Sequence, residues 1–302
     1  MITSLVEAIG NTPLVRLRSL EADVPGVEIW AKLEWFNPGG SVKDRAAGGI
    51  IRDAIDRGLV GPGLPRALLD STSGNTGIAY AWIGAALGVR VALVMPENVS
   101  DARKRIARSF GAEVIFSDPQ EQSDGAIRLA RKLAAEQPDR FHYADQYSNA
   151  ANPGAHERGT AGEVWAQTDG RVTHFVAGIG TGGTIIGTGR GLKAKRRDIR
   201  IVAVEPAEPL HGLEGLKHMP SSIVPPIYKE AELDRKISIE TDEGWDVADR
   251  LIREEGLLAG HSAGAAAAGA LRVARELAAA GKGGLIVTLF PDRADRYLPP
   301  PP

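Results

Sequence analysis

The sequence predicts an open, doubly wound α/β fold. Short apolar runs alternate with stretches of helical periodicity along almost the whole chain, which is the pattern of β-α units that build a parallel sheet. The apolar runs are nearly continuous and do not alternate with polar residues, so they indicate strands that are covered on both faces. The length of 302 residues fits two such units or one large one. Folds of this kind bind ligands at the carboxyl ends of their strands.

The individual elements follow from these two patterns. Strands are predicted at residues 29–33, 67–70, 91–95, 113–116, 174–177, 201–204 and 285–288. Helices are predicted at residues 44–59, 76–87, 101–110, 123–136, 155–167, 184–195, 243–255 and 263–280. Residues 206–227 lack a clear period, and we expect them to form a loop that faces the substrate.

The composition narrows the class of protein. A formal net charge of −2, with 25% charged residues, gives no reason to expect nucleic acid or an anionic membrane as a partner. The chain has no cysteine, which rules out a disulfide framework and a thiolate metal site. We expect no metal site. The N-terminus lacks the pattern of a signal peptide and no apolar run approaches about 18 residues, so the expected location is the cytoplasm.

Lys43 stands where a Pro-Gly-Gly turn at residues 38–40 runs into a predicted helix. An amine at the start of a helix feels the positive end of the helix dipole, which lowers the pKa of such an amine. A lysine of this kind can form a Schiff base with an aldehyde and can later act as a base. Most lysines are solvated surface groups, but two further loops favour a chemical role for this one.

A glycine-rich loop at residues 178–184 follows an apolar strand and precedes a helix. Glycines let the backbone approach a phosphate closely, and the helix N-terminus supplies N–H donors. The loop therefore predicts a phosphate site. It also matches the dinucleotide pattern G-x-G-x-x-G, with Glu205 ending the next strand about twenty residues on. A Rossmann NAD-dependent oxidoreductase therefore remains an alternative of a different class.

A second loop, at residues 70–77, reads Asp-Ser-Thr-Ser-Gly-Asn-Thr-Gly between a strand and a helix. Its hydroxyls, its amide and the N–H groups of the helix start suit a carboxylate and a phenolic oxygen. A Ser or Thr N-cap alone would explain part of this composition. Six small or polar residues in succession exceed what capping requires.

A third loop, at residues 260–265, reads Gly-His-Ser-Ala-Gly-Ala before an alanine-rich helix. Ser262 is an N-cap candidate, and a neutral hydroxyl there could also meet a heterocyclic nitrogen. The loop matches the Gly-x-Ser-x-Gly pattern of α/β-hydrolases, which need an acid and then a histidine after the serine. No histidine follows His261, so the hydrolase interpretation fails on residue order.

Together these segments resemble the fold-type II pyridoxal-phosphate (PLP) enzymes, specifically the cysteine synthases (O-acetylserine sulfhydrylases) and the related cystathionine β-synthases. The similarity covers essentially the whole chain in the expected order. The resemblance implies PLP as cofactor and a tryptophan synthase β-like fold, with two doubly wound, mainly parallel α/β domains and the cofactor between them. The segments that carry it are residues 9–15, 37–45, 72–76, 180–184 and 291–297.

The resemblance also implies roles for single residues. Lys43 would be the catalytic lysine that carries the cofactor, and Ser262 would face the pyridine nitrogen. Asn75 would bond the cofactor's 3′-oxygen, and Gln146 would assist the substrate carboxylate. The cofactor phosphate is expected on Gly180, Thr181, Gly182, Gly183 and Thr184, and the substrate carboxylate on Thr72, Ser73, Gly74, Asn75 and Thr76.

The implied reaction is a β-replacement that forms L-cysteine from O-acetyl-L-serine and sulfide through an aminoacrylate intermediate. O-Phosphoserine sulfhydrylase and cystathionine β-synthase remain alternatives, because residues 209–219 differ from the best-known O-acetylserine enzymes where substrate choice is expected. Lys217, His211 and His218 in this segment could instead hold a phosphate leaving group. A neutral Ser262 fits elimination and replacement better than transamination.

The resemblance implies the domain boundaries and partners as well. Residues 1–13 and 36–147 would form a smaller, mobile domain with the substrate loop. Residues 14–35 and 148–302 would form the domain that binds the PLP phosphate, so residues 14–35 would cross over to the C-terminal sheet. Relatives of this kind are commonly homodimers, and we expect a homodimer here. A complex with serine acetyltransferase stays open, and neither nucleic acid nor a membrane is expected as a partner.

Overall fold

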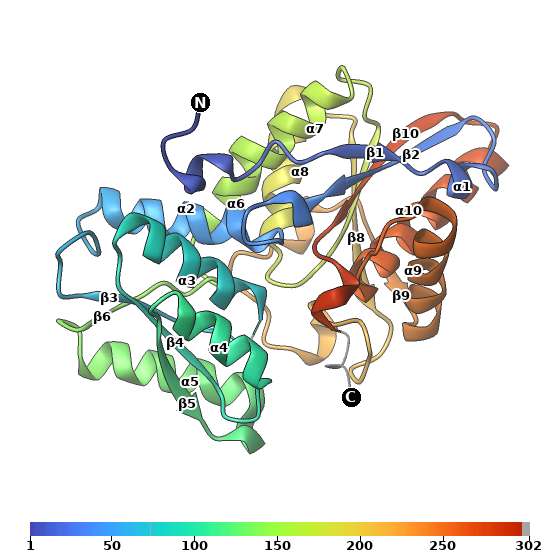
Figure 1. Cartoon of the computed structure of the whole chain (residues 1–302). Helices are drawn as coiled ribbons and strands as arrows, with labels where there is room; N and C mark the ends of the chain where they lie inside the picture. Colours follow the sequence, from blue (N-terminus) through green and yellow to red (C-terminus); the bar gives the residue numbers. More distant parts are fainter. Residues whose placement is uncertain (73, 298–302) are drawn as a thin grey trace. The chain divides into compact units, whose positions relative to one another are not determined.

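The computed structural model describes residues 1–72 and 74–297, and the chain divides into two compact units. The first unit comprises Met1–Ile9 and Lys43–Asn152, and the second comprises Gly10–Val42 and Pro153–Pro302. Each unit holds one sheet with helices packed against it (Figure 1). The unit boundary thus falls directly before Lys43.

The first unit is built on a parallel four-stranded sheet in the order β5-β4-β3-β6. Its strands are β3 (Ala67–Ser71), β4 (Val91–Pro96), β5 (Glu113–Ser117) and β6 (Phe141–Tyr143). Its helices are α2 (Lys43–Asp56), α3 (Asn75–Leu87), α4 (Asp101–Ser109) and α5 (Gln122–Glu136), with the short 3-10 helices η1 (Leu5–Ala8) and η3 (Pro119–Glu121).

Both faces of this sheet are buried, as the continuous apolar runs predict. Leu68 and Leu93 belong to a core that includes residues of α2 and α3. Their neighbours Leu69 and Val94 belong to a second core, with Ala130 of α5. Side chains alternate between the two faces of a strand, so the two cores lie on opposite sides of the sheet.

The second unit contains a six-stranded sheet in the order β1-β2-β10-β7-β8-β9. All neighbours are parallel except β1, which is antiparallel to β2. The strands are β1 (Leu14–Arg16), β2 (Val27–Leu33), β7 (His174–Gly178), β8 (Arg200–Pro206), β9 (Arg235–Ile239) and β10 (Gly284–Phe290). The longer helices are α7 (Ala161–Gln167), α8 (Gly183–Lys195), α9 (Thr241–Glu255) and α10 (His261–Ala279).

Short helical segments complete the second unit and its junction with the first. The π-helical segment His156–Thr160 (η4) leads directly into α7. The others are α1 (Arg18–Glu21), α6 (Ala151–Ala155), η2 (Glu34–Phe36), η5 (Met219–Ser221), η6 (Glu230–Glu232) and η7 (Ala294–Arg296).

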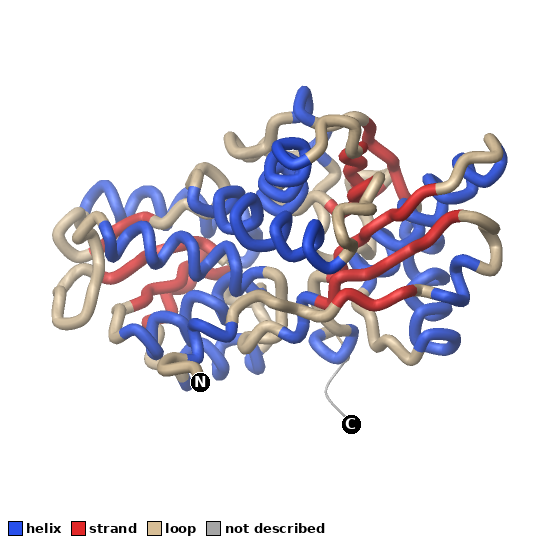
Figure 2. The backbone as a smooth tube through the Cα atoms, turned by 90° about the horizontal axis from the view of Figure 1, so that it is seen from above, coloured by secondary structure: helices blue, strands red, loops and turns tan. Residues whose placement is uncertain are grey.

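This second sheet also separates two cores. Val202 and Val204 of β8 pack in a core with residues of α9 and α10. Ile201 and Ala203 pack in a core with residues of α7 and α8. In Figure 2 the strands of each unit accordingly run between helices. The fold is the doubly wound, mainly parallel arrangement that the sequence predicts.

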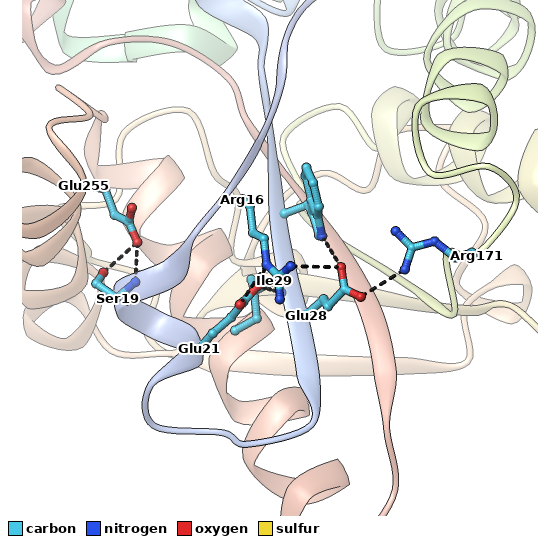
Figure 3. A network of polar contacts seen from close by, with 8 residues as sticks. Arg16, Ser19, Glu21, Glu28, Ile29, Arg171 and Glu255 are labelled. Atoms are coloured by element: carbon cyan, nitrogen blue, oxygen red, sulfur yellow. Dashed lines mark hydrogen bonds and ion pairs between the residues drawn. The ribbon is translucent and has the colours of Figure 1, made fainter.

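The N-terminal hairpin at residues 14–33 belongs to the C-terminal sheet, because β2 pairs in parallel with β10 along its whole length. Polar contacts reinforce this pairing (Figure 3). Glu21 binds the Arg16 guanidinium at 2.9 Å and accepts the Ile29 backbone N–H at 2.8 Å. Two further contacts join the hairpin to residues outside it: Glu28 pairs with Arg171 at 2.9 Å, and Glu255 accepts both donors of Ser19 at 2.7 Å.

Every predicted strand and helix coincides with an observed element, and three observed strands lack a prediction. Strands β1 and β6 are each three residues long, which is too short for a periodic signal. Strand β9 lies at a sheet edge and alternates between exposed and buried residues. Residues 206–227 contain only one 3-10 turn, as expected for a loop. No helix in the described part of the chain is long and apolar enough to cross a membrane.

Candidate active site

Lys43 is the first residue of α2, and the turn before it is fixed on both sides. Gly40 has a φ of +76°, which glycine adopts without strain. The Arg296 guanidinium donates to the Gly39 carbonyl, and a Cβ at position 40 would collide with that guanidinium. The Val42 N–H donates to the Pro291 carbonyl at 2.9 Å. The Pro-Gly-Gly turn therefore has a defined shape where the lysine helix begins.

Helix α2 is anchored within the first unit by a buried carboxylate. Asp44 is fully buried, and its Oδ1 accepts the indole N–H of Trp82 on α3 at 3.1 Å. Helices α2 and α3 both contribute to one apolar core, with Ile50, Ile51 and Ile83 among its members. The helix that starts at Lys43 is thus held against the helix that follows the predicted substrate loop.

The predicted substrate loop connects the end of β3 with the start of α3. Gly74 is the N-cap of α3 and Asn75 is its first residue. The Gly74 N–H donates to the Thr72 hydroxyl at 3.3 Å. A Cβ at Gly77 would lie 3.1 Å from the Thr72 methyl group, so the loop packs tightly against the first turn. Ser73, which the sequence also assigns to this loop, lies outside the described residues.

Gln146 reaches this loop from the segment that follows β6. Its Oε1 accepts the Thr76 hydroxyl at 2.9 Å, and its Nε2 donates to the Ser71 carbonyl at 3.3 Å. The Gln146 carbonyl accepts the Asn152 side-chain amide at 2.8 Å. The structure thus brings Thr72, Gly74, Asn75, Thr76 and Gln146 together in the first unit.

Asp70 also lies in this region, and no motif in the sequence predicts a role for it. It is fully buried at the end of β3 and accepts the backbone N–H groups of Ser71 at 2.8 Å and Gln146 at 3.2 Å. Burial raises the pKa of Asp70 to about 7, although these hydrogen bonds act in the opposite direction. A carboxylate in an otherwise apolar strand was the signal in the sequence that could have identified it.

The predicted phosphate loop lies in the second unit, between β7 and α8. Gly182 is the N-cap of α8 with a φ of +87°, and the Gly183 N–H donates to the Thr181 hydroxyl at 3.3 Å. A Cβ at Gly180 would lie 2.6 Å from the Gly215 carbonyl, so only glycine fits there. The hydroxyl of Thr184 lies 3.3 Å from Nε2 of the buried His156.

Ser262 is the second residue of α10 and is buried. The N-cap Gly260 donates its N–H to the Asp292 carbonyl at 3.2 Å, just beyond the carboxyl end of β10. The ring of His261 lies between those of Trp245 and Tyr297, with centroid distances of 5.0 and 6.5 Å. The N-terminus of α10 is therefore fixed at the edge of the sheet where β10 ends.

The phosphate loop and Ser262 lie at the same edge of this sheet. Strands β7 and β10 are parallel neighbours, and their carboxyl ends lead to the phosphate loop and to the contact with Gly260. A helix N-terminus that lacks room for side chains at Gly180 and Gly182 suits a phosphate. A neutral serine suits a ring nitrogen. The residues present therefore fit pyridoxal phosphate. The described residues contain no cluster of His, Cys, Asp and Glu suited to a metal ion.

Comparison with known proteins decides the family. The chain matches the model of the pyridoxal-phosphate-dependent enzymes over residues 5–292. It belongs to that family. The cofactor is therefore pyridoxal phosphate, and the dinucleotide interpretation of residues 178–183 is not supported. The fold-type II architecture predicted from the motifs is confirmed.

The PLP enzymes most similar to this chain include cysteine synthases. Cysteine synthase of Aquifex aeolicus is 52% identical over 98% of this chain and 90% of that protein. Cysteine synthase B of Salmonella typhimurium is 42% identical over 98% of this chain and 95% of that protein. Among solved structures, O-acetylserine sulfhydrylase isoform 3 from Entamoeba histolytica has a TM-score of 0.92 and 36% identity, covering 99% of this chain and 90% of that one. The predicted resemblance to cysteine synthases is confirmed.

Proposed function

We propose that the protein is a PLP-dependent cysteine synthase that forms L-cysteine from O-acetyl-L-serine and sulfide. The observation that carries this proposal is the 52% identity to a cysteine synthase over 98% of the chain. The lysine at the start of α2, the loop before α3 and the glycine-rich loop before α8 supply the groups that this reaction needs.

Each group of residues has a role in the proposal. Lys43 holds the cofactor, and Asn75 bonds its 3′-oxygen. Ser262 meets the pyridine nitrogen. The phosphate binds to Gly180, Thr181, Gly182, Gly183 and Thr184, and the substrate carboxylate binds to Thr72, Ser73, Gly74, Asn75 and Thr76 with help from Gln146.

The chain's own groups position the substrate and move its proton. When bound, the cofactor supplies the electron sink for charge that develops at the substrate Cα. Once the substrate amine has replaced Lys43 on the cofactor, the freed Lys43 amine would take the proton from Cα, and acetate would leave from Cβ. Sulfide then forms the new bond at Cβ, and Lys43 returns the proton to Cα. The N–H groups at the start of α3 hold the substrate carboxylate throughout, because that helix terminus favours an anion.

The structure disfavours a phosphate leaving group at the histidines of the 209–219 segment. Burial, followed by the neighbouring His218 side chain, lowers the pKa of His211, which favours the neutral form of this ring. Its Nδ1 accepts the Leu213 N–H at 3.2 Å. Nδ1 of His218 contacts the Ser221 hydroxyl at 2.7 Å. Both rings are thus engaged in local turns, and we retain O-acetylserine as the donor.

Steady-state kinetics with three donors and two acceptors test this choice. O-Acetylserine, O-phosphoserine and serine would each be assayed with sulfide and with homocysteine. We expect kcat/KM to be at least about tenfold higher for O-acetylserine with sulfide, because acetate leaves more easily than hydroxide and a neutral His211 offers no charge to a phosphate. A tenfold preference for O-phosphoserine that Lys217→Ala abolishes would overturn the choice of donor. Faster turnover of serine with homocysteine would indicate a cystathionine β-synthase.

We further propose that the enzyme works in the cytoplasm as a homodimer. The absence of cysteine is compatible with a reducing compartment, and the resemblance to the cysteine synthases supports the dimer. The same resemblance supports a smaller, mobile domain at residues 1–13 and 36–147 that moves on substrate binding. Light scattering on the purified protein tests the dimer, and a monomeric mass would refute it.

A further inference from the structure

Asp70 connects two segments that the proposed substrate site uses. One of its oxygens accepts the N–H of Ser71, the residue before the loop at 72–76. The other accepts the N–H of Gln146, which lies 76 residues further along the chain. Both contacts are buried. A single carboxylate thus holds the backbone of both segments.

Gln146 extends this connection to the loop itself. Its side chain accepts the Thr76 hydroxyl at 2.9 Å and donates to the Ser71 carbonyl at 3.3 Å. Thr76 and Gln146 are each only 4% exposed, so water does not compete for these bonds. The chain of contacts therefore runs from Asp70 through the backbone and side chain of Gln146 to Thr76.

The ionisable groups that face Asp70 do not neutralise its charge. They are Tyr80 from α3, Tyr143 from β6, and Asp145 and Tyr147 from the segment after β6. Burial raises the pKa of each tyrosine above its ordinary value, so all three are neutral. The charge of Arg131 on α5 acts on the pKa of Tyr143, and the charge of Asp124 on α5 acts on the pKa of Tyr147; neither is among the groups that shift the pKa of Asp70. Hydrogen bonds from the two backbone N–H groups, together with the Tyr80 hydroxyl, are therefore what supports an Asp70 carboxylate.

We propose that Asp70 is the positioning residue of the amino-acid site, and that its ionised carboxylate fixes Gln146 and, through it, Thr76 for the substrate carboxylate. This inference rests on the proposed role of residues 72–76 in substrate binding. An ionised carboxylate accepts both N–H groups in charge-assisted hydrogen bonds, whereas protonation turns one of its oxygens into a hydroxyl, which is a weaker acceptor for its N–H donor. The amino-acid affinity should therefore fall when Asp70 gains a proton.

Burial of Asp70 places this change near neutral pH, since it raises the pKa of the carboxyl group to about 7. KM for O-acetylserine should rise as the pH falls from 8.5 to 6. kcat should change much less, because the proposal gives Asp70 a role through Gln146 and none in the transfer of the proton or of the leaving group. Direct damage to the chemistry would lower kcat instead.

The first experiment follows the two backbone amides by NMR in the PLP-loaded enzyme. The N–H resonances of Ser71 and Gln146 should shift together with one midpoint near neutral pH. In Asp70→Asn, neither resonance should show that transition. Resonances that do not titrate in the wild type would overturn the proposal, whatever the substrate of the enzyme is.

The second experiment compares KM and kcat in matched variants. Asp70→Asn should raise KM for O-acetylserine at pH 8.5 by about tenfold, the effect expected for one lost charge-assisted hydrogen bond, and should remove the pH dependence of KM. Asp145→Asn removes a neighbouring carboxylate, and asparagine tolerates the φ of +44° at that position. That control should keep the wild-type KM at pH 8.5.

A double-mutant cycle tests the route through Gln146. If Asp70 acts through that side chain, adding Asp70→Asn to Gln146→Ala should change KM by less than about twofold, whereas independent effects would multiply. The proposal is contradicted if the fold-changes in KM of the two single variants multiply in the double variant, or if Asp70→Asn keeps the wild-type KM. If the wild type does not turn over O-acetylserine, the proposed function fails, and the amide titration with the Kd of L-serine in the same variants still decides the role of Asp70.

Discussion

At the scale of single residues, the proposed chemistry depends on side chains whose surroundings change their ordinary behaviour. Lys43 lies at a helix start behind a fixed glycine turn. Asp70 is a buried carboxylate that is held by two N–H groups. The chain itself reveals the turn before Lys43, so the lysine could be predicted. The partners of Asp70 become visible only in the fold, since Gln146 is 76 residues away.

Asp70→Asn should also change how stability depends on pH. The pKa of Asp70 is raised from 3.8 to about 7 in the folded state, so its stabilising contribution is complete below pH 3.8 and is lost as the pH rises through 7. Asparagine does not titrate, so the variant does not lose stability in this way as the pH rises. Its unfolding free energy relative to the wild type should therefore increase between pH 5 and 8, by about 2 kcal/mol.

Urea unfolding at the two pH values checks this prediction. A difference between variant and wild type that stays constant, or that falls toward pH 8, would show that Asp70 does not titrate in this range. The expected result means that ionisation of Asp70 lowers the stability of the fold. Such a trade-off between stability and function is common at functional sites.

At the scale of elements, four helix N-termini carry groups of the proposed site, and the first is that of α2, which begins at Lys43. Helix α3 follows the substrate loop, α8 follows the phosphate loop, and α10 begins next to Ser262. The substrate loop and the phosphate loop each join the end of a strand to a helix, so their unusual runs of glycines and hydroxyls stand out in the sequence. Strands β1, β6 and β9 could not be predicted, because they are too short or too exposed to show a pattern.

The phosphate loop should fail when Gly182 gains a side chain. A Cβ there would lie 3.0 Å from the Tyr228 side chain, and the φ of +87° is strained for any other residue. Gly182→Val should therefore displace the loop and weaken retention of PLP by tenfold or more, as a rough expectation for several displaced N–H donors. Visible absorbance after dialysis measures the loss.

Gly111→Val is the matched control, because Gly111 has a φ of +82° with open space around its Cβ position. It should lose about 1–2 kcal/mol of stability through backbone strain but retain PLP like the wild type. Equal retention in both variants would argue against the phosphate site at Gly182.

The pairing of β2 with the C-terminal sheet should depend on a buried lysine. Lys32 is fully buried, lies 2.7 Å from a Glu163 oxygen and donates at 3.0 Å to the Thr12 carbonyl. Lys32→Met would leave Glu163 without this cation, so unfolding should become about 3 kcal/mol easier. Arg57→Ala removes an exposed ion pair and should cost less than about 1 kcal/mol. If chemical denaturation shows the same loss of unfolding free energy in Lys32→Met and in Arg57→Ala, this role of Lys32 is refuted.

At the scale of the whole molecule, the sequence predicted the architecture well because both sheets are mainly parallel and are buried on both faces. Such strands appear as continuous apolar runs, and the helices between them keep a clear period. The motifs at residues 43, 72–76 and 180–184 then indicated one family, which the comparisons confirm. The tertiary contacts of Lys32, Asp70 and His156 could not be predicted, because they join residues that are distant in the chain.

The proposed function requires the Lys43 amine for the formation of cysteine. The most direct measurement is the rate of cysteine formation from O-acetylserine and sulfide by PLP-loaded wild type, Lys43→Ala and the surface control Lys132→Ala. We predict that Lys43→Ala keeps its fold by circular dichroism but loses at least about 10³-fold in rate, since it lacks the amine that moves the proton. Lys132 is exposed and should be dispensable. A Lys43→Ala variant that forms cysteine at the wild-type rate would contradict the account.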